Sequence, residues 1–397
     1  MSLNEKYYGP DFNSLERQDP EVASVVLSEL ERQRKNLQLI ASENFASEVV
    51  RNLCASVFTN KYAEGVPGRR FYNGCEHADE IESLAIEYAT TLFGCQFANV
   101  QPHSGANANL AVFKALLQPG DVILGMDLSN GGHLSHGSHV NLSGSWFRAA
   151  KYGVDQNGII DYSKIWQMAE DLKPKIIIAG ASSYSQIIDW AQFGNIAKSV
   201  GALLLCDVAH YSGLIAGGQY PSPFPYADVV TSTTHKTLRG PRGGIILWND
   251  NQLTGKINNA VFPGTQGGPL MHIIAAKAQC FHEALQKDFR TYSKQVVTNA
   301  KAMVEIFQKN GVDIVSGGTE CHMFTIDLGK EQHSGREFAD ILERNGITVN
   351  KNAVPGDTRN FIETSGVRIG TAAETTRGHD ELWFKELAQK IVDLLRT

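Results

Sequence analysis

Short apolar runs that are continuous rather than alternating mark the middle of the chain. Between about residue 80 and residue 250 they fall at 121–125, 175–179, 203–206, 229–230 and 244–248, separated by stretches with helical periodicity. Strands that are buried on both faces have such runs, because helices cover both sides of a parallel sheet. We therefore predict an α/β fold with a mostly parallel central sheet flanked by helices.

The N-terminal part of the chain is predicted to be helical. Asp19-Pro20-Glu21 is a typical helix start, with a capping residue, a proline at the first helical position and an acid in the first turn. Apolar residues at helical spacing follow it, at Val22, Val25, Val26 and Leu30. This pattern predicts an N-terminal helical arm over residues 1–55.

The C-terminal part of the chain mixes helices and strands. Two amphipathic helices are expected, one with Tyr292, Val296, Ala300, Met303 and Phe307 on its apolar face and one with Trp383, Leu387, Ile391 and Leu395. Strand candidates lie between them at 321–328 and 347–349. We therefore predict a large domain at 56–284 and a smaller α+β domain at 285–397, closely packed because no low-complexity linker separates them.

Composition narrows the class of protein. The 397 residues carry a formal net charge of −6 and no long basic block, which argues against nucleic acid as a partner. No apolar run approaches the roughly 20 residues of a membrane span, and residues 1–6 lack the apolar core of a signal peptide. The six cysteines are spread widely without a Cys-x-x-Cys pair, as expected of free thiols. We therefore expect a cytoplasmic protein that binds neither nucleic acid nor a membrane.

One lysine is unusual in its setting. Lys236 lies beside His235 in a polar loop rich in Gly and Pro, just after a strand-like run. A partly desolvated lysine could lose its proton there and attack a carbonyl. Upstream, the apolar run at 203–206 ends in Asp207. A Schiff-base lysine and an acid that pairs with a pyridinium nitrogen are the two groups that a pyridoxal 5'-phosphate (PLP) site needs, so the pair indicates a PLP enzyme.

Three further segments are candidates for binding. The small residues Ser104-Gly105-Ala106 precede a helical pattern, and free N–H groups at a helix start can bind a phosphate. Gly267-Gly268 lies in a shaped Gly/Pro loop that could offer backbone donors, although a plain connector has the same composition. Arg368 lies between strand-like residues and could bind a carboxylate, with a surface ion pair as the alternative.

Two histidines share one flexible turn, His133 and His136. A metal site is one interpretation, but no clustered carboxylates or cysteines accompany them, so we expect no metal. A ring that stacks on a flat cofactor suits His133 better, and a structural histidine is the alternative.

Many segments together resemble the serine hydroxymethyltransferase family, over nearly the whole chain. The matching motifs include residues 37–44, 60–65, 74–76, 98–105, 207–210, 233–238, 262–269 and 347–352. The resemblance implies a fold-type I PLP enzyme that transfers a one-carbon unit from serine to tetrahydrofolate. It also implies a homodimer, or a tetramer built from such dimers, with active sites shared between subunits.

The resemblance also implies a role for each matching residue. The catalytic set would be Lys236, Glu64, Tyr72 and His235, with Lys236 binding the cofactor covalently and Glu64 as the acid–base carboxylate. Cofactor contacts would come from Ser104, Gly105, Ala106, His133, Ser182, Asp207 and His210, and from Tyr62, Gly267 and Gly268 of the partner chain. Ser42 and Arg368 would hold the substrate carboxylate, and Leu128, Leu134, Asn352 and Glu64 would contact folate.

Six positions depart from the family's pattern, at Val66, Phe71, Asn130, Tyr211, Cys321 and Ala372. A relative with a wider pocket or an altered acceptor would show such changes. An α-methylserine hydroxymethyltransferase and a folate-independent threonine aldolase or transaldolase are therefore alternatives. A non-catalytic PLP-binding paralogue is the remaining one, and it is disfavoured because Lys236, Asp207, Glu64 and Arg368 are all present.

Overall fold

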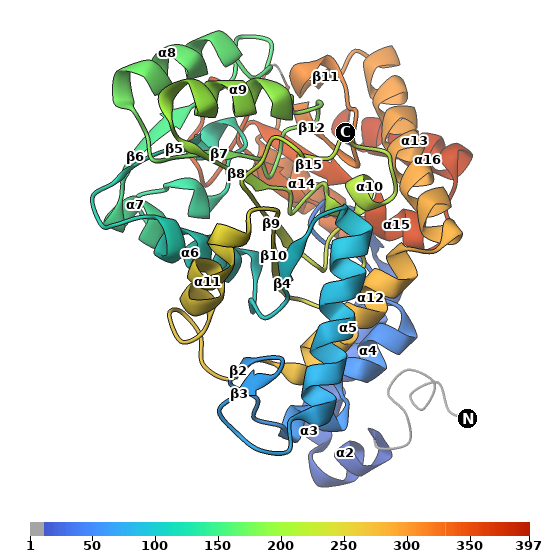
Figure 1. Ribbon diagram of the computed structural model, residues 1–397. Helices are drawn as coiled ribbons and strands as arrows, with labels where there is room; N and C mark the ends of the chain where they lie inside the picture. The colour runs from blue at the N-terminus through green and yellow to red at the C-terminus, as the bar shows by residue number, and fades with distance from the viewer. Residues whose placement is uncertain (1–11, 330) are drawn as a thin grey trace.

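A computed structural model describes residues 12–329 and 331–397 (Figure 1). The first residues of the predicted N-terminal arm therefore lie outside the described part of the chain. None of the helices in the described ranges combines the length and the apolar content that crossing a membrane requires.

A seven-stranded sheet forms the centre of the molecule. Its strands in spatial order are β4 (Phe97–Asn99), β10 (Gly244–Trp248), β9 (Val229–Thr233), β8 (Leu203–Asp207), β7 (Ile176–Ala179), β5 (Val122–Met126) and β6 (Arg148–Tyr152). The pairs from β9 to β6 are parallel, whereas β10 is antiparallel to both β9 and β4. The prediction of a mostly parallel sheet is confirmed. A loop without a crossover helix connects β9 to β10, because antiparallel neighbours need no crossover connection.

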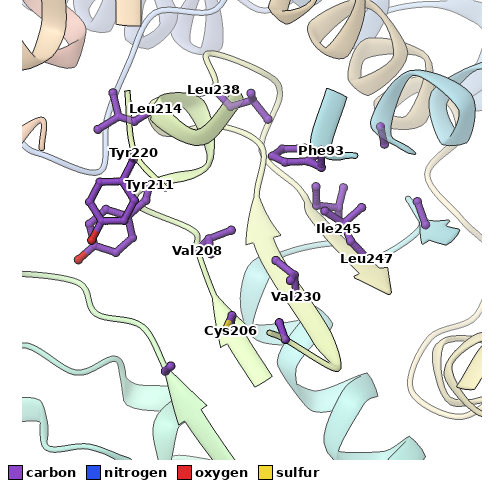
Figure 2. Close-up of a cluster of buried hydrophobic side chains, with 14 of the residues drawn as sticks. Phe93, Cys206, Val208, Tyr211, Leu214, Tyr220, Val230, Leu238, Ile245 and Leu247 are labelled. Carbon is purple, nitrogen blue, oxygen red and sulfur yellow. The ribbon is translucent and has the colours of Figure 1, made fainter. Parts of the chain in front are cut away.

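Helices cover both faces of this sheet. One face packs on α6 (Gly105–Leu116) and α11 (Asn251–Val261). The other packs on α5 (Glu76–Phe93), α8 (Tyr162–Leu172), α9 (Trp190–Val200) and α12 (Met271–Ala284). Alternate strand residues therefore enter different cores, as with Leu205 on the first face and Cys206 on the second. Figure 2 shows part of the second core, where Val230, Ile245 and Leu247 gather.

A second, smaller sheet lies in the C-terminal part. Its order is β11 (Asp313–Ile314), β12 (Met323–Asp327), β15 (Gly366–Gly370) and β14 (Asn350–Asn352). It packs on α13 (Lys287–Lys309), α14 (Gly335–Arg344) and α16 (Glu381–Leu395) in a core of its own. The long helix α13 takes part in both cores, with Val296 in the large one and Phe307 in the small one. We propose a domain division near residue 285, supported by these separate cores.

The N-terminal segment packs against the C-terminal part of the chain, next to the small sheet. Helix α3 (Pro20–Lys35) begins as predicted, because the Asp19 carboxylate accepts a hydrogen bond from the Val22 N–H. Strand β1 (Leu37–Gln38) then pairs in parallel with β13 (Ile347–Thr348). The predicted apolar stripe of α3 is only partly covered, since Val22 is 48% and Val25 70% exposed.

The other elements are short and connect these layers. They are α2 (Phe12–Gln18), α4 (Glu48–Cys54), α7 (Leu142–Trp146), α10 (Ser212–Ala216), α15 (Ala372–Thr376) and a hairpin of β2 (Gly65–Val66) and β3 (Arg69–Arg70). Within residues 12–329 and 331–397 there are also 3-10 turns, at η1 (Val57–Asn60), η2 (Leu128–Asn130), η3 (Leu134–His136) and η4 (Val315–Gly317).

Candidate active site

Lys236 lies in a pocket at the carboxyl end of the parallel strands, where α/β folds place their ligands. The pocket is lined by Gly105, Ala106, His133, His136, Ala181, Ser182, Asp207, Ala209, His210, Thr233 and Lys236. The lysine is only 8% exposed. Burial lowers its pKa to about 8, against the opposing attraction of Asp207. A fraction of this amine is therefore neutral, and nucleophilic, near neutral pH.

Asp207 closes one side of the pocket, at the last residue of β8. Its Oδ2 accepts hydrogen bonds from Asn109 Nδ2 (2.8 Å) and contacts His136 Nε2 at 2.9 Å, and its Oδ1 accepts one from the Ala209 N–H. Burial alone would raise the pKa of this carboxyl, but the bond to His136 and the two neighbouring histidines hold it below its ordinary value. The pocket therefore contains a fixed negative charge.

Sequence reasoning missed Asn109 and His136 as partners of this carboxylate. His136 lies in the same turn as His133, so the two-histidine turn in the sequence pointed to it. Asn109 lies on the buried face of α6, and no sequence pattern pointed to it. The ligand atoms of His133, His136 and Asp207 all lie within 4.8 Å of one another, a spacing that a metal ion could also use. Hydrogen bonds already engage the Asp207 carboxylate, and all three side chains line the Lys236 pocket.

Two histidines face the pocket in their neutral forms. Burial, followed by repulsion from His136, lowers the pKa of His133 to about 4, and its Nδ1 contacts the Ser135 hydroxyl at 2.7 Å. Burial and the charge of Lys236 likewise lower the pKa of His210. His210 Nδ1 lies 3.3 Å from His322 Nε2, a second buried histidine that the sequence did not single out. Neutral rings suit stacking or hydrogen bonding more than charge pairing.

The segment Ser104–Ala106 forms the start of α6, as predicted. The Ser104 hydroxyl caps the helix by accepting a hydrogen bond from the Asn107 N–H. Gly105 lies so close to β9 that a Cβ atom there would be 2.7 Å from the Thr233 methyl. Gly105 and Ala106 line the Lys236 pocket directly, so free backbone N–H groups of a helix start face it.

Arg368 lies on β15 of the small sheet and contacts a residue of this pocket. It is 9% exposed, and its guanidinium donates to the Ser182 carbonyl (2.6 Å) and to Asn350 Oδ1 (3.2 Å). Burial lowers its pKa to about 10, which still leaves it charged at neutral pH. Ser182 itself lines the pocket.

Ser42 and His235 are placed differently from the rest. Both line a separate, wide cleft beside α3 and Arg242, and neither lines the Lys236 pocket. Burial, followed by the charge of Arg242, lowers the pKa of His235 to about 3. The carboxylate-binding role of Ser42 and the catalytic role of His235, which the resemblance implies, therefore stay predictions.

A second cluster gathers five of the predicted residues elsewhere on the chain. The Tyr72 hydroxyl donates to Glu64 Oε2 at 3.2 Å, and the rings of Tyr62 and Tyr72 meet edge to face at 5.3 Å. A Cβ atom at Gly268 would touch the Tyr62 ring, and one at Gly267 would lie 3.5 Å from Glu64. Tyr62 is 56% exposed, and none of the five lines the Lys236 pocket. Figure 1 shows the neighbouring β2–β3 hairpin low in the view, away from β7 and β8.

Of the predicted folate contacts, Asn352 and Leu128 lie near one cavity, whereas Glu64 lies elsewhere. The Asn352 amide donates to the Ser183 hydroxyl at 3.3 Å and lines a small cavity with Ser129 and Asn130. Leu128 begins the turn that leads to that cavity, and Leu134 is 43% exposed on the next turn. Glu64 belongs to the other cluster.

The six departures from the family's pattern lie in different parts of the structure. Tyr211 is buried in the core, where its ring stacks on Tyr220 at 4.6 Å (Figure 2). Cys321 and Ala372 are buried as well, and Val66 lines a surface groove against α5.

Two further departures lie in loops and turns. Asn130 accepts a hydrogen bond from the Val154 N–H, and Phe71 is 74% exposed and packs its ring against Phe262. None of the six lines the Lys236 pocket, so a wider pocket stays a prediction.

The residues of this pocket fit a flat, phosphorylated pyridine with an aldehyde. The cavity joins a nucleophilic amine, a buried carboxylate, a neutral imidazole ring and the start of a helix. Each matches one part of PLP, in the order aldehyde, pyridinium nitrogen, ring face and phosphate.

Comparisons with known proteins agree with this chemistry. The family model described as serine hydroxymethyltransferase matches residues 15–391. The serine hydroxymethyltransferase of Psychrobacter sp. (strain PRwf-1) is 56% identical over 383 residues, covering 96% of this chain and 92% of the relative. That of Wolbachia sp. subsp. Drosophila simulans is 56% identical over 397 residues, covering 100% and 93%. That of Nitratiruptor sp. is 54% identical over 381 residues, covering 96% and 92%.

Proposed function

The chain belongs to the serine hydroxymethyltransferase family, and we propose that it transfers the hydroxymethyl carbon of serine to tetrahydrofolate at the pocket of Lys236. The products are glycine, methylene-tetrahydrofolate and water. The observation that carries the proposal is the joint placement of the Lys236 amine and the Asp207 carboxylate in one buried pocket. PLP, when bound there, supplies an electron sink that lets bonds to the amino-acid Cα break.

The pocket residues would hold the cofactor in the charge state that this chemistry needs. The depressed pKa of Asp207 keeps its carboxylate ionised, which favours a proton on the pyridine nitrogen beside it. Lys236 would attach the cofactor through its neutral amine and give way to the amine of serine. His133, whose pKa is about 4, would lie neutral against the ring. The N–H groups at the start of α6 would bind the phosphate.

Arg368 would hold the serine carboxylate. It is charged and buried beside Ser182, a residue of the Lys236 pocket. A guanidinium forms two parallel hydrogen bonds with a carboxylate, which would fix the orientation of the Cα–Cβ bond over the cofactor.

Glu64 would move a proton on the substrate hydroxyl, and it would do so in the partner's pocket. It forms a cluster with Tyr62, Tyr72 and the Gly267-Gly268 loop, and this cluster does not line the Lys236 pocket of its own chain. Its partly exposed aromatic rings and the exposed valines of α3 offer surface for a second copy. We therefore propose a homodimer in which each pocket uses Lys236 of one chain and Glu64 of the other.

Conversion of serine into glycine, measured by amino-acid chromatography with and without tetrahydrofolate, tests this function. We expect PLP-loaded protein to release glycine much faster when tetrahydrofolate is present. Equal rates with and without tetrahydrofolate would instead favour the folate-independent aldolase or transaldolase. A preference for α-methylserine over serine would identify the α-methylserine enzyme. Absence of turnover with all of these amino acids would leave the non-catalytic paralogue.

A further inference from the structure

A buried lysine that the proposed chemistry does not use lies behind the phosphate-binding segment. Lys277 on α12 is 1% exposed. Its ammonium donates to three backbone carbonyls, those of Val100 (2.6 Å), Pro102 (3.0 Å) and Gly244 (2.9 Å). A lysine ammonium has three N–H donors, so all of them are satisfied by main chain. A charge buried to this degree is costly unless it is matched in this way.

The three carbonyls belong to the backbone that leads into the start of α6. Val100 follows β4, Pro102 lies two residues before Ser104, and Gly244 begins β10. The Gly244 N–H also donates to the Pro102 carbonyl (2.9 Å), so the two segments are joined directly as well. Three carbonyl oxygens that converge on one point repel one another, and the ammonium is the group that lets them converge.

Close packing leaves this arrangement no freedom to shift. A Cβ atom at Gly243 would lie 2.4 Å from Lys277 Cε, and one at Gly244 would lie 2.2 Å from the Ser104 carbonyl oxygen. The next N–H along the chain, that of His103, donates to Gln266 Oε1 (2.9 Å). The peptide planes before Ser104 are therefore held from both sides, by Lys277 and by the Gln266 side chain.

We propose that Lys277 is a positioning residue, which holds the 100–105 backbone in the conformation that binds the cofactor phosphate. The inference rests on the proposed function, because it assigns the phosphate of PLP to the start of α6. Burial lowers the pKa of Lys277 to about 7, against the opposing attraction of Glu82. Its ammonium form places a positive charge behind that segment, which favours an anion in front of it. A purely structural lysine would stabilise the edge of the sheet without affecting phosphate recognition.

Comparison of pyridoxal 5'-phosphate with pyridoxal separates these two roles. Both aldehydes can attach to Lys236, so the ratio of their dissociation constants on the cofactor-free protein reports the phosphate alone. We expect Lys277→Met to lower the preference for the phosphorylated form by about tenfold or more, with pyridoxal affinity changed by less than about threefold. The matched control is Ser293→Ala, which removes another buried side-chain hydrogen bond, to the Gly213 carbonyl.

The outcomes distinguish the inference from the function on which it rests. The inference would be overturned if Lys277→Met prefers pyridoxal 5'-phosphate over pyridoxal as strongly as the unaltered protein does and only its thermal stability is lowered. If that variant does not fold, Lys277→Gln, which keeps two N–H donors without the charge, takes its place with the same criterion. Failure of the unaltered protein to bind either aldehyde would instead contradict the proposed PLP enzyme.

Discussion

The Lys236 amine is tuned by two opposing effects, since burial disfavours its ammonium form and the Asp207 carboxylate favours it. Burial is the larger effect, so the pKa falls to about 8 from the ordinary value of 10.5. Only the neutral amine attacks an aldehyde. The fraction of protein that can react with PLP therefore increases as pH rises through this pKa.

This shift predicts the pH dependence of cofactor attachment. Mixing cofactor-free protein with PLP in a stopped-flow instrument should give a rate of attachment that rises between roughly pH 7 and pH 9 and then levels off. An ordinary lysine would keep accelerating beyond pH 10. Lys236→Ala is the control, and it should remove the visible absorbance of covalently bound cofactor altogether. If the rate of attachment does not level off below pH 10, Lys236 does not have the lowered pKa described here.

Arg368 gives a second prediction at the level of single residues. Arg368→Ala should raise the Michaelis constant for serine about a hundredfold, because losing one partner of a buried charge pair costs about 2–5 kcal/mol. Asn350→Ala is the matched control, since it removes only the neighbour that accepts from Arg368 Nε. We expect that control to change the Michaelis constant by a small factor. Similar values for Arg368→Ala and the unaltered protein would rule out carboxylate binding by Arg368.

Sequence alone could identify the charged members of the site but not the groups that support them. Asp207 ends an apolar run and Lys236 lies in the polar loop after another one, so both can be recognised in the sequence. Asn109 and His322 lie far along the chain from their partners Asp207 and His210, so only the folded structure brings them together. Ser42 and His235 line a cleft together with residues of α3, and no sequence pattern indicated that cleft.

At the level of elements, the buried strands were predictable and the edge strands were not. The central strands β5, β7, β8, β9 and β10 coincide with the continuous apolar runs to within a few residues. Strand β6 forms one edge of the sheet and reads Arg-Ala-Ala-Lys-Tyr, with Arg148 and Lys151 exposed. An edge strand meets water, so it lacks the continuous apolar run on which the prediction relied.

The start of α6 supplies a prediction for an element. Gly105→Ala should weaken PLP binding about tenfold, because the new methyl would lie 2.7 Å from the Thr233 methyl and push the helix start away from β9. Fluorescence titration of cofactor-free protein measures the affinity. Adding Thr233→Ser, which removes that methyl and keeps the hydroxyl, should restore most of the loss. Gly255→Ala on the exposed side of α11 has open space and should leave PLP affinity unchanged.

At the level of the whole molecule, the predicted site residues form two separate clusters within one chain. Lys236 and its neighbours form a pocket, whereas Glu64 and Tyr72 lie together outside it. A second copy of the chain that covers the exposed Val22 and Val25 of α3 would bury apolar surface and could bring its own Glu64 to the pocket. The two halves of the chemistry would then come from different chains.

Hybrid dimers test this arrangement. Lys236→Ala and Glu64→Gln chains, each inactive alone, should recover about a quarter of the unaltered activity when they are co-expressed in equal amounts, because half of the dimers are hybrids and each hybrid has one complete site. Serine cleavage in the presence of tetrahydrofolate provides the readout. If each pocket used the Glu64 of its own chain, the mixture would stay inactive.

The pairing of β1 with β13 has a consequence for the order in which the molecule can form. Leu37 and Gln38 reach their partners Ile347 and Thr348 only after the ribosome has added roughly 300 further residues, which takes some tens of seconds at about 5 to 20 residues per second. Throughout that time the large sheet can assemble, while Leu39 lacks the core in which it is finally buried. The beginning of the chain is thus among the last parts to reach its native contacts, and the nascent protein carries an unpaired strand that chaperones could bind.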